Sequence, residues 1–145
     1  MDSSVPFVLM LLMCSSIIVE AQLKVYDLRA SNLPTVILLT TDAYVTVSSG
    51  STSLGKTSVR YNDPNPWWEE EFSYFYAEEN DMLTLEEFSY FYAEENDMLT
   101  LEVWDLDLLF DDQLGVCQRQ LKVGTYQHDC FLTKGGTLHY TYTLG

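Results

Sequence analysis

Apolar and polar residues alternate along several short segments of the chain. Alternation with a period of two places successive side chains on opposite faces of a β-strand. It is clearest in residues 23–28, 43–47 and 72–76, and strand-like residues continue in Met98–Trp104, Leu114–Val123 and Thr137–Leu144. Turn-forming residues separate these segments, and none of them has a sustained helical period. The pattern predicts an all-β fold, an antiparallel two-sheet β-sandwich of about eight strands.

The N-terminal segment has a different character. Residues 5–19 are apolar apart from Cys14, Ser15 and Ser16, and this run is shorter than the roughly 20 residues that a membrane-spanning helix needs. Val19 and Ala21 are small residues at the positions that a signal peptidase reads. We therefore predict a signal peptide over residues 1–21, with an uncleaved anchor as the alternative, because the first six residues contain no Lys or Arg. Residues 22–145 then form one secreted sandwich domain.

Sixteen residues occur twice in succession, because residues 71–86 and residues 87–102 are identical. Solenoid proteins repeat three or more diverged units, so a single identical pair indicates a recent tandem duplication or a gene-model error. One copy is then surplus to the sandwich. We expect Phe72–Tyr76 and Met98–Trp104 to keep the strand positions, and much of Ala77–Tyr92 to form an added hairpin or loop.

The composition excludes some classes of function. The chain has 22 acidic and 7 basic residues and a formal net charge of −15, which is unsuited to binding a nucleic-acid backbone over a broad face. Hydrophobic residues make up 47% of the chain, enough to build a core. The two histidines, His128 and His139, have no serine or cysteine nucleophile at a recognisable spacing, so we expect no enzyme.

Gly50–Thr57 matches the phosphate-binding pattern G-x-x-x-x-G-K-[ST]. That pattern binds nucleotide only where the Lys and Thr open a helix. Here the chain continues through Ser58–Tyr61 into a turn that contains Pro64 and Pro66. We therefore predict a β-hairpin turn at this position and no nucleotide binding.

A group of acidic residues lies between the strands predicted at residues 98–104 and 114–123. Asp105 and Asp107 are two residues apart at a strand end, so their side chains leave the same face, and Asp111 and Asp112 return after a short loop. Four converging carboxylates repel one another unless they are protonated or bridged by a cation. Ca²⁺ prefers such oxygen ligands, so we predict a Ca²⁺ site here, with a solvated acidic loop as the alternative.

Cys117 and Cys130 are the two cysteines that remain once residues 1–21 are removed. Two cysteines in a secreted domain are typical of one disulfide. Two buried free thiols become the better interpretation only if the chain is not secreted.

Several motifs occur in the order found in a C2 domain. They are Asp42–Val47, Asn65–Glu70 running into Phe72, Val103–Asp107, and Asp112–Gly115. The resemblance covers nearly all of residues 22–145 and implies a Ca²⁺- and phospholipid-binding module. It assigns Asp42 to the second aspartate of loop one, Asp105 and Asp107 to the loop-three pair, and Asp112 to the last loop-three ligand.

Within the family, the chain is most similar to the C-terminal C2 domain of perforin. The similarity lies in Thr41–Val45, in the Trp-Asp-x-Asp loop and in the ending Gly136–Thr143. It implies a disulfide between Cys117 and Cys130 and a free-standing secreted module.

Two departures from the family pattern affect the metal site. Loop one carries no acidic residue before Asp42, and loop three is one residue shorter than expected between Asp107 and Asp112. We expect one or two weak Ca²⁺ sites, with dissociation constants of roughly 10⁻⁴–10⁻³ M. Asn62 or Asp63 in loop two is a further possible ligand, with an ordinary turn role as the alternative.

Apolar residues flank these acidic positions. Clustered apolar residues at loop tips indicate membrane or partner contacts, and we assign this role to Val36, Ile37, Leu38, Leu39, Leu108, Leu109 and Phe110. The prediction is a secreted protein that binds phospholipid membranes when Ca²⁺ is present. The alternatives are a Ca²⁺-independent protein-interaction module with a degenerate metal site, and apolar tips that fold back onto the sandwich.

Overall fold

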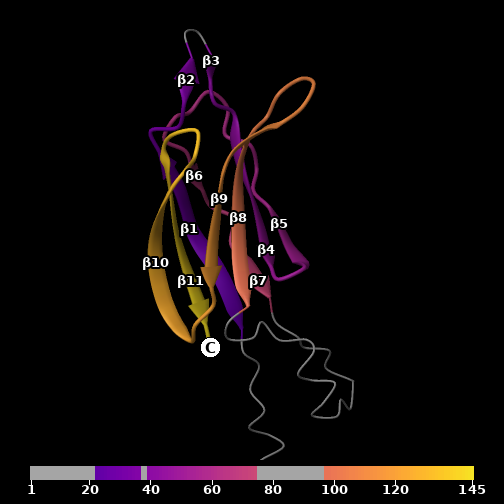
Figure 1. Cartoon of the computed structure of the whole chain (residues 1–145), viewed down its shortest axis with the longest axis vertical. Helices are drawn as coiled ribbons and strands as arrows, with labels where there is room; N and C mark the ends of the chain where they lie inside the picture. Colours follow the sequence, from indigo (N-terminus) through magenta and orange to yellow (C-terminus); the bar gives the residue numbers. More distant parts are fainter. Residues whose placement is uncertain (1–21, 37–38, 75–96) are drawn as a thin grey trace, which may run out of the picture.

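The computed structural model describes residues 22–36, 39–74 and 97–145 (Figure 1). The predicted signal peptide, Ile37, Leu38 and the predicted extra loop Ala77–Tyr92 lie outside these ranges. All regular structure in the described residues is β-strand. No helix in this part of the chain is long and apolar enough to span a bilayer.

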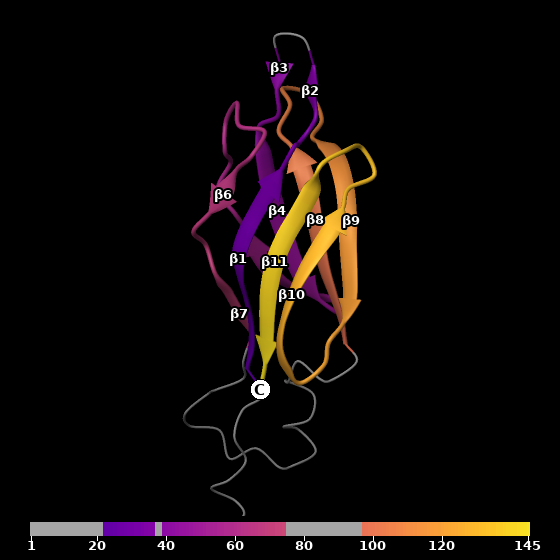
Figure 2. The same ribbon diagram turned by 90° about the vertical axis from the view of Figure 1, so that its left-hand side faces the viewer.

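The strands form two sheets that face each other (Figures 1 and 2). The first sheet contains, in spatial order, β10 (Gly124–Phe131), β11 (Thr137–Leu144), β1 (Leu23–Ser31) and β6 (Trp67–Trp68), with β7 (Phe72–Tyr74) also paired to β1. The second sheet has the order β5 (Thr52–Lys56), β4 (Ala43–Ser49), β8 (Met98–Asp105) and β9 (Asp112–Gln120). A small hairpin is formed by β2 (Thr35–Val36) and β3 (Leu39–Thr40). The predicted antiparallel β-sandwich is confirmed.

The core lies between the sheets and follows the alternation in the sequence. In β4, residues Ala43, Val45 and Val47 are buried, and in β8 the buried residues are Leu99, Leu101 and Val103. The first sheet contributes mainly Leu23, Val25, Leu28, Trp68, Leu138, Tyr140, Tyr142 and Leu144. Each fully buried aliphatic or aromatic side chain of this kind contributes about 1.5–3 kcal/mol.

The observed strands differ from the predicted ones in several places, among them β9, which spans Asp112–Gln120 rather than Leu114–Val123. The strand β1 continues to Ser31 past an irregularity between Tyr26 and Arg29, where Asp27 has a φ of 57°. The strand β10 was not predicted, because its inward positions are occupied partly by residues that are not apolar. Among them is His128, which stacks with Tyr142 at a ring distance of 5.8 Å. Burial lowers the pKa of this imidazole, which keeps it neutral inside the sandwich edge.

The duplicated residues supply strands to both sheets. β7 begins at Phe72 in the first copy, and β8 begins at Met98 in the second. These are the starts expected for the two strands, although β7 ends at Tyr74 rather than at residue 76. Both the end of β7 and the start of β8 lie at the end of the sandwich where β1 begins (Figure 1).

The Gly50–Thr57 segment is a hairpin, as predicted. Gly50 has a φ of 56° in the turn between β4 and β5, and the two strands pair from Ser49 and Thr52 onward. Thr57 is buried, accepts a hydrogen bond from the Val45 backbone N–H at 2.9 Å and donates one to the Ser58 carbonyl at 2.9 Å. Its hydroxyl is therefore used in fixing the end of this hairpin.

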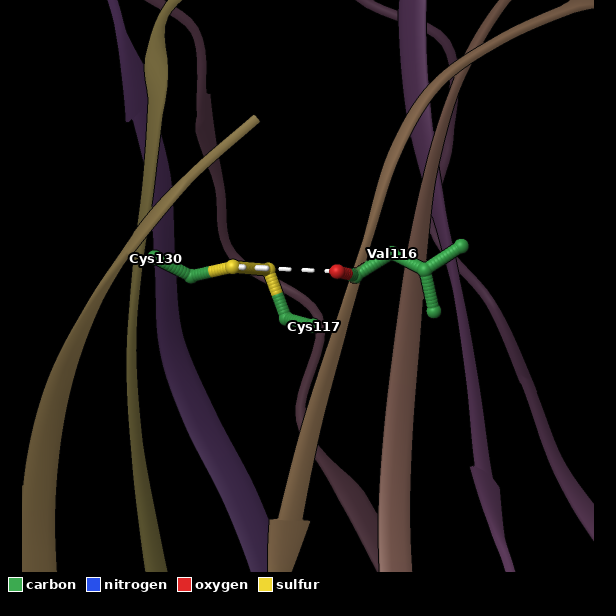
Figure 3. The surroundings of a disulfide bond; sticks show 3 residues. All are labelled: Val116, Cys117 and Cys130. Carbon is green, nitrogen blue, oxygen red and sulfur yellow. Dashed lines mark hydrogen bonds between the residues drawn. A yellow bond between two sulfur atoms is a disulfide. The ribbon is translucent and has the colours of Figure 1, made fainter. Parts of the chain in front are cut away.

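A disulfide joins Cys117 of β9 to Cys130 of β10 across a Cα–Cα distance of 6.0 Å (Figure 3). These two strands are the edges of different sheets, so the bond closes one open side of the sandwich. The Cys130 Sγ also lies 4.0 Å from the Val116 carbonyl oxygen. Because an oxidised sulfur has no hydrogen to donate, this approach is a packing contact.

We predict that the double variant Cys117→Ala/Cys130→Ala lowers the free energy of unfolding by about 3 kcal/mol, because a loop of this length is no longer constrained in the unfolded chain. Urea unfolding measures the loss. The wild type in reductant should unfold at the same midpoint as the variant, and the variant should not respond to reductant. A variant midpoint equal to that of the oxidised wild type would show that the bond is dispensable for stability.

Candidate functional site

Three loops meet at the end of the sandwich opposite to the C-terminus (Figures 1 and 2). Loop one is residues 32–42 and includes the β2–β3 hairpin, loop two is residues 57–66, and loop three is residues 106–111 between β8 and β9. Ala43 pairs with Asp105 in the β4–β8 ladder, and Asp105 pairs with Asp112 in the β8–β9 ladder. These registers bring the predicted acidic residues of loops one and three to the same end of one sheet.

Hydrogen bonds between backbone and carboxylate join the loops. The Asp42 backbone N–H donates to Asp105 Oδ1 at 2.8 Å, and the Asn62 backbone N–H donates to Asp42 Oδ1 at 2.8 Å. The Leu106 backbone N–H donates to the Asp42 carbonyl oxygen at 2.8 Å. Asp42 thus contacts both neighbouring loops, and its carboxylate and that of Asp105 are held close together.

The grouping of these carboxylates changes the pKa of Asp105. Burial raises the pKa of the Asp105 carboxyl above its usual range, and the negative charges of Asp42, Asp112 and Asp107 raise it further. The hydrogen bond from the Asp42 backbone lowers it without cancelling the rise. Four of the five predicted acidic ligands therefore interact at this position.

Asp111, the fifth predicted acidic ligand, has a different role. Its Oδ2 accepts a hydrogen bond from the Tyr44 hydroxyl at 2.5 Å, and its Oδ1 accepts one from the Asp107 backbone N–H at 3.2 Å. The Tyr44 bond holds the pKa of Asp111 below its usual range, while burial and the Asp111 charge raise the pKa of Tyr44 to about 12. Asp111 therefore ties loop three to β4 through Tyr44.

Asn62 and Asp63 stabilise turns in loop two. The Asn62 side-chain oxygen accepts a hydrogen bond from the Thr40 hydroxyl at 2.8 Å, and Asp63 Oδ1 accepts one from the Asn65 backbone N–H at 2.9 Å. Asn62 has a φ of 53°, which Asn tolerates better than most residues. These contacts fit the turn role that was the alternative to metal binding.

The acidic residues line a hollow between the loops with a volume of about 590 Å³. We call it the first hollow. Its walls carry Asp42, Asp105 and Asp107, and its apolar lining comes from Leu39, Leu106 and Leu108. Tyr61, an exposed residue of loop two that the sequence did not single out, also lines it.

Apolar side chains of loop three, and Leu39 of loop one, are open to solvent. Leu108, Leu109 and Phe110 are 101%, 85% and 86% exposed, and Leu39 is 72% exposed. They do not fold back onto the sandwich, contrary to the alternative considered for this segment. Of the other predicted contact residues, Ile37 and Leu38 lie outside the described ranges, and Val36 forms part of β2.

The donor atoms around the first hollow have the chemistry that Ca²⁺ requires, since it is coordinated by oxygen ligands from carboxylates and carbonyls. The carboxylates of Asp42 and Asp105 are each engaged by a backbone N–H, and Asp107 Oδ1 accepts from the Leu108 N–H at 2.6 Å. Within residues 22–36, 39–74 and 97–145, no group of three or more acidic, His or Cys side chains is already placed to hold a metal ion. The carboxylates predicted as ligands lie at one end of the sandwich, where they accept hydrogen bonds from the protein backbone.

A second polar cluster, missed in the sequence, lies on the outer face of the first sheet. His139 Nε2 is 2.9 Å from the Ser31 hydroxyl, and His139 Nδ1 is 2.6 Å from Asp129 Oδ1. Ser31, His139 and Asp129 are thus connected in the same order as the Ser, His and Asp side chains of a catalytic triad. However, the Asp129 side chain is 71% exposed, so water screens its effect on the imidazole. Strand pairing between β1, β11 and β10 accounts for the contacts.

The family model of the C2 domain matches residues 21–134. A solved structure described as "Structure of a C2 domain" is 53% identical to the chain, with a TM-score of 0.72, and the match covers 86% of this chain and 98% of that one. None of the curated proteins compared with the chain matches it.

Two more distant structures share the fold. A C2 domain of a plant extended synaptotagmin 1 is 18% identical with a TM-score of 0.64, and the match covers 86% of this chain and 93% of that one. A calcium-bound pair of C2 domains from extended synaptotagmin 2 is 19% identical with a TM-score of 0.65, over 86% of this chain and 45% of that one. With the family model matching most of its length, the chain belongs to the C2 domain family.

Proposed function

We propose that the chain is a secreted module that binds phospholipid membranes when Ca²⁺ is present. The observation that carries this proposal is the first hollow, which is lined both by three acidic residues and by the exposed apolar residues Leu39 and Leu108. Binding at this end requires no catalytic group, in keeping with a family of binding modules. The calcium-bound extended synaptotagmin 2 structure gives further support, because it has the same fold.

The apolar tips supply the attraction to the membrane interior. Leu108, Leu109 and Phe110 are almost fully exposed in the structure, so moving them into a bilayer removes nearly their whole apolar surface from water. At about 1.5–3 kcal/mol for each side chain, complete insertion would contribute at most about 5–9 kcal/mol. Exposed apolar patches of this kind mark membrane or partner sites in soluble domains.

The carboxylates oppose insertion until their charge is neutralised. Asp42, Asp105 and Asp107 line the first hollow together with the apolar residues Leu39 and Leu108. Bringing unpaired carboxylates close to a bilayer is unfavourable, because they lose water and repel anionic headgroups. These three residues would hold Ca²⁺, which when bound supplies cancelling positive charge and open coordination positions for lipid phosphate oxygens.

Secretion is supported by two features. Residues 1–21 have the apolar run and small residues typical of a signal peptide, and the Cys117–Cys130 disulfide is of the kind that persists in oxidising compartments. The resemblance to the C-terminal C2 domain of perforin, which we infer from sequence motifs, would fit such a location. We propose an extracellular protein that associates with membrane surfaces from the outside.

Liposome co-sedimentation with millimolar Ca²⁺ and with chelator tests the membrane function. We predict that the protein sediments with phospholipid vesicles in Ca²⁺. The Leu109→Ser variant should bind about tenfold more weakly or worse, because it lacks one apolar side chain that the wild type would bury in the bilayer. Val123→Ser is the matched control, since Val123 is also an exposed aliphatic residue but lies between β9 and β10 at the other end of the sandwich. Its binding should equal that of the wild type.

A protein that shows no Ca²⁺-dependent sedimentation would contradict the proposal. The alternative would then be a Ca²⁺-independent protein-interaction module, for which the absence of an acidic residue in loop one before Asp42 is the supporting observation.

We also predict that Asp105→Asn raises the melting temperature in chelator at pH 7. Folding raises the pKa of Asp105, so the ionised form destabilises the folded state, and this loss of stability develops as the pH rises through the folded-state pKa. The amide oxygen of Asn can still accept the bond from Asp42. The gain should vanish below the ordinary carboxyl pKa, where both proteins are neutral at this position.

The matched control is Glu69→Gln, which removes one negative charge from an exposed residue outside the first hollow. Its melting temperature should stay close to that of the wild type. If Asp105→Asn melts at or below the wild-type temperature at pH 7 in chelator, the carboxylates do not repel one another as described. With Ca²⁺ added, the order should reverse, because only the wild type then gains from binding the ion.

A further inference from the structure

Asp105 lies between two hollows at the loop end of the sandwich. The first hollow contains the carboxylates of Asp42, Asp105 and Asp107. A second hollow, with a volume of about 410 Å³, contains the carboxylates of Asp105 and Asp112 together with Lys134. The loop-one residues that line this second hollow are Pro34, Leu39, Thr40 and Thr41, and none of them is acidic.

Lys134 is held at the second hollow by its own backbone. It lies in the turn between β10 and β11, and its N–H donates to the Leu114 carbonyl oxygen at 3.0 Å, which fastens the turn to β9. The Lys134 ammonium forms a hydrogen-bonded ion pair with Asp112 Oδ1. Asp112 in turn faces Asp105 across the β8–β9 ladder.

The ion pair between Lys134 and Asp112 contributes little to the stability of the fold. Both side chains are 50% exposed, and an exposed ion pair contributes little to the free energy of unfolding because water screens it. Its effect lies in the charge that it places in the hollow. The ammonium neutralises Asp112 where loop one offers no second acidic ligand.

We infer that Lys134 is a built-in counter-ion that occupies one of two cation positions, so that the chain binds a single Ca²⁺ ion in the first hollow. This inference rests on the proposed Ca²⁺-dependent function, and it adds an explanation of why only one ion binds. A divalent ion entering the second hollow would meet a positive charge that is already bonded to one of its two carboxylates, and this repulsion weakens binding there. Lys134 therefore places a positive charge in the second hollow, whether or not the first hollow is filled.

Isothermal titration with CaCl₂ tests the inference directly, because it counts ions without using membrane binding. The test variant is Lys134→Met, which keeps much of the apolar stem and removes the charge. Lys134→Arg keeps the charge. Lys122→Met removes one positive charge from the β9–β10 connection at the opposite end of the sandwich, and it controls for the change in net charge.

We expect one ion for the wild type, for Lys134→Arg and for Lys122→Met, and two ions for Lys134→Met, with its first ion bound about tenfold more tightly. The Lys134→Met variant should fold, since the lost pair is half exposed. Circular dichroism in chelator confirms that the folded forms are compared.

The outcomes separate this inference from the function on which it rests. If the wild type and Lys134→Met each bind one ion with affinities within about twofold of each other, Lys134 does not occupy a cation position, although Ca²⁺ binding itself stands. If only Lys134→Met binds Ca²⁺, the counter-ion role is supported, and the Ca²⁺-dependent function of the wild type is wrong. If no variant binds Ca²⁺, both are overturned.

Discussion

The pairing of β4 with β8 is the constraint on which the loop end of this protein depends. Because Ala43 lies opposite Asp105 in the ladder, the residue before β4 and the last residue of β8 meet at the same sheet end. Asp42 and Asp105 are then joined by a backbone-to-carboxylate bond of 2.8 Å. The hydrophobic alternation of the two strands fixes this register, since a slip of β8 by one residue would turn its buried residues Leu99, Leu101 and Val103 outward. Core packing therefore forces two negative charges together.

The same register gives each acidic residue a different environment. Asp105 is partly buried among other carboxylates, and its pKa rises. Asp111, six residues later, accepts a hydrogen bond from the Tyr44 hydroxyl, and its pKa falls. Asp112 is paired with an ammonium. These acidic residues look alike in the sequence but have three different roles. Asp105 is a carboxyl group with a raised pKa at the first hollow, Asp111 ties loop three to β4, and Asp112 forms an ion pair.

The sequence predicted those parts of the structure that follow from local patterns. The strands β4, β8 and β11 were found because their apolar residues alternate or crowd between turns, and the hairpin at Gly50–Thr57 was found because no helical sequence follows it. The loop-end grouping of Asp42, Asp105, Asp107 and Asp112 was expected from the order of motifs in a C2 domain. Long stretches of the fold therefore needed no information from tertiary contacts.

The features that were missed depend on contacts between distant residues. The Tyr44–Asp111 bond spans 67 residues, and the Lys134–Asp112 pair joins different hairpins. The contacts of Ser31 and Asp129 with His139 join three strands. The strand β10 was hidden because the inward position of His128 suits a neutral imidazole among tyrosine rings rather than an aliphatic side chain. No spacing in the chain marks such pairs, since only the folded sheets bring their members together.

The place of the duplication in the fold explains how the domain retains its loop end. β7 ends at Tyr74 and β8 begins at Met98, and both of these positions lie at the end of the sandwich away from loops one, two and three. The entropy lost on closing a connection between two strands grows only with the logarithm of its length, so sixteen more residues cost on the order of 1 kcal/mol. That loss is comparable to one exposed contact and smaller than the contribution of a single core leucine. Because β8 keeps its pairing with β4 through Ser49–Leu99 and on to Ala43–Asp105, the added length does not shift the register that brings Asp42 to Asp105.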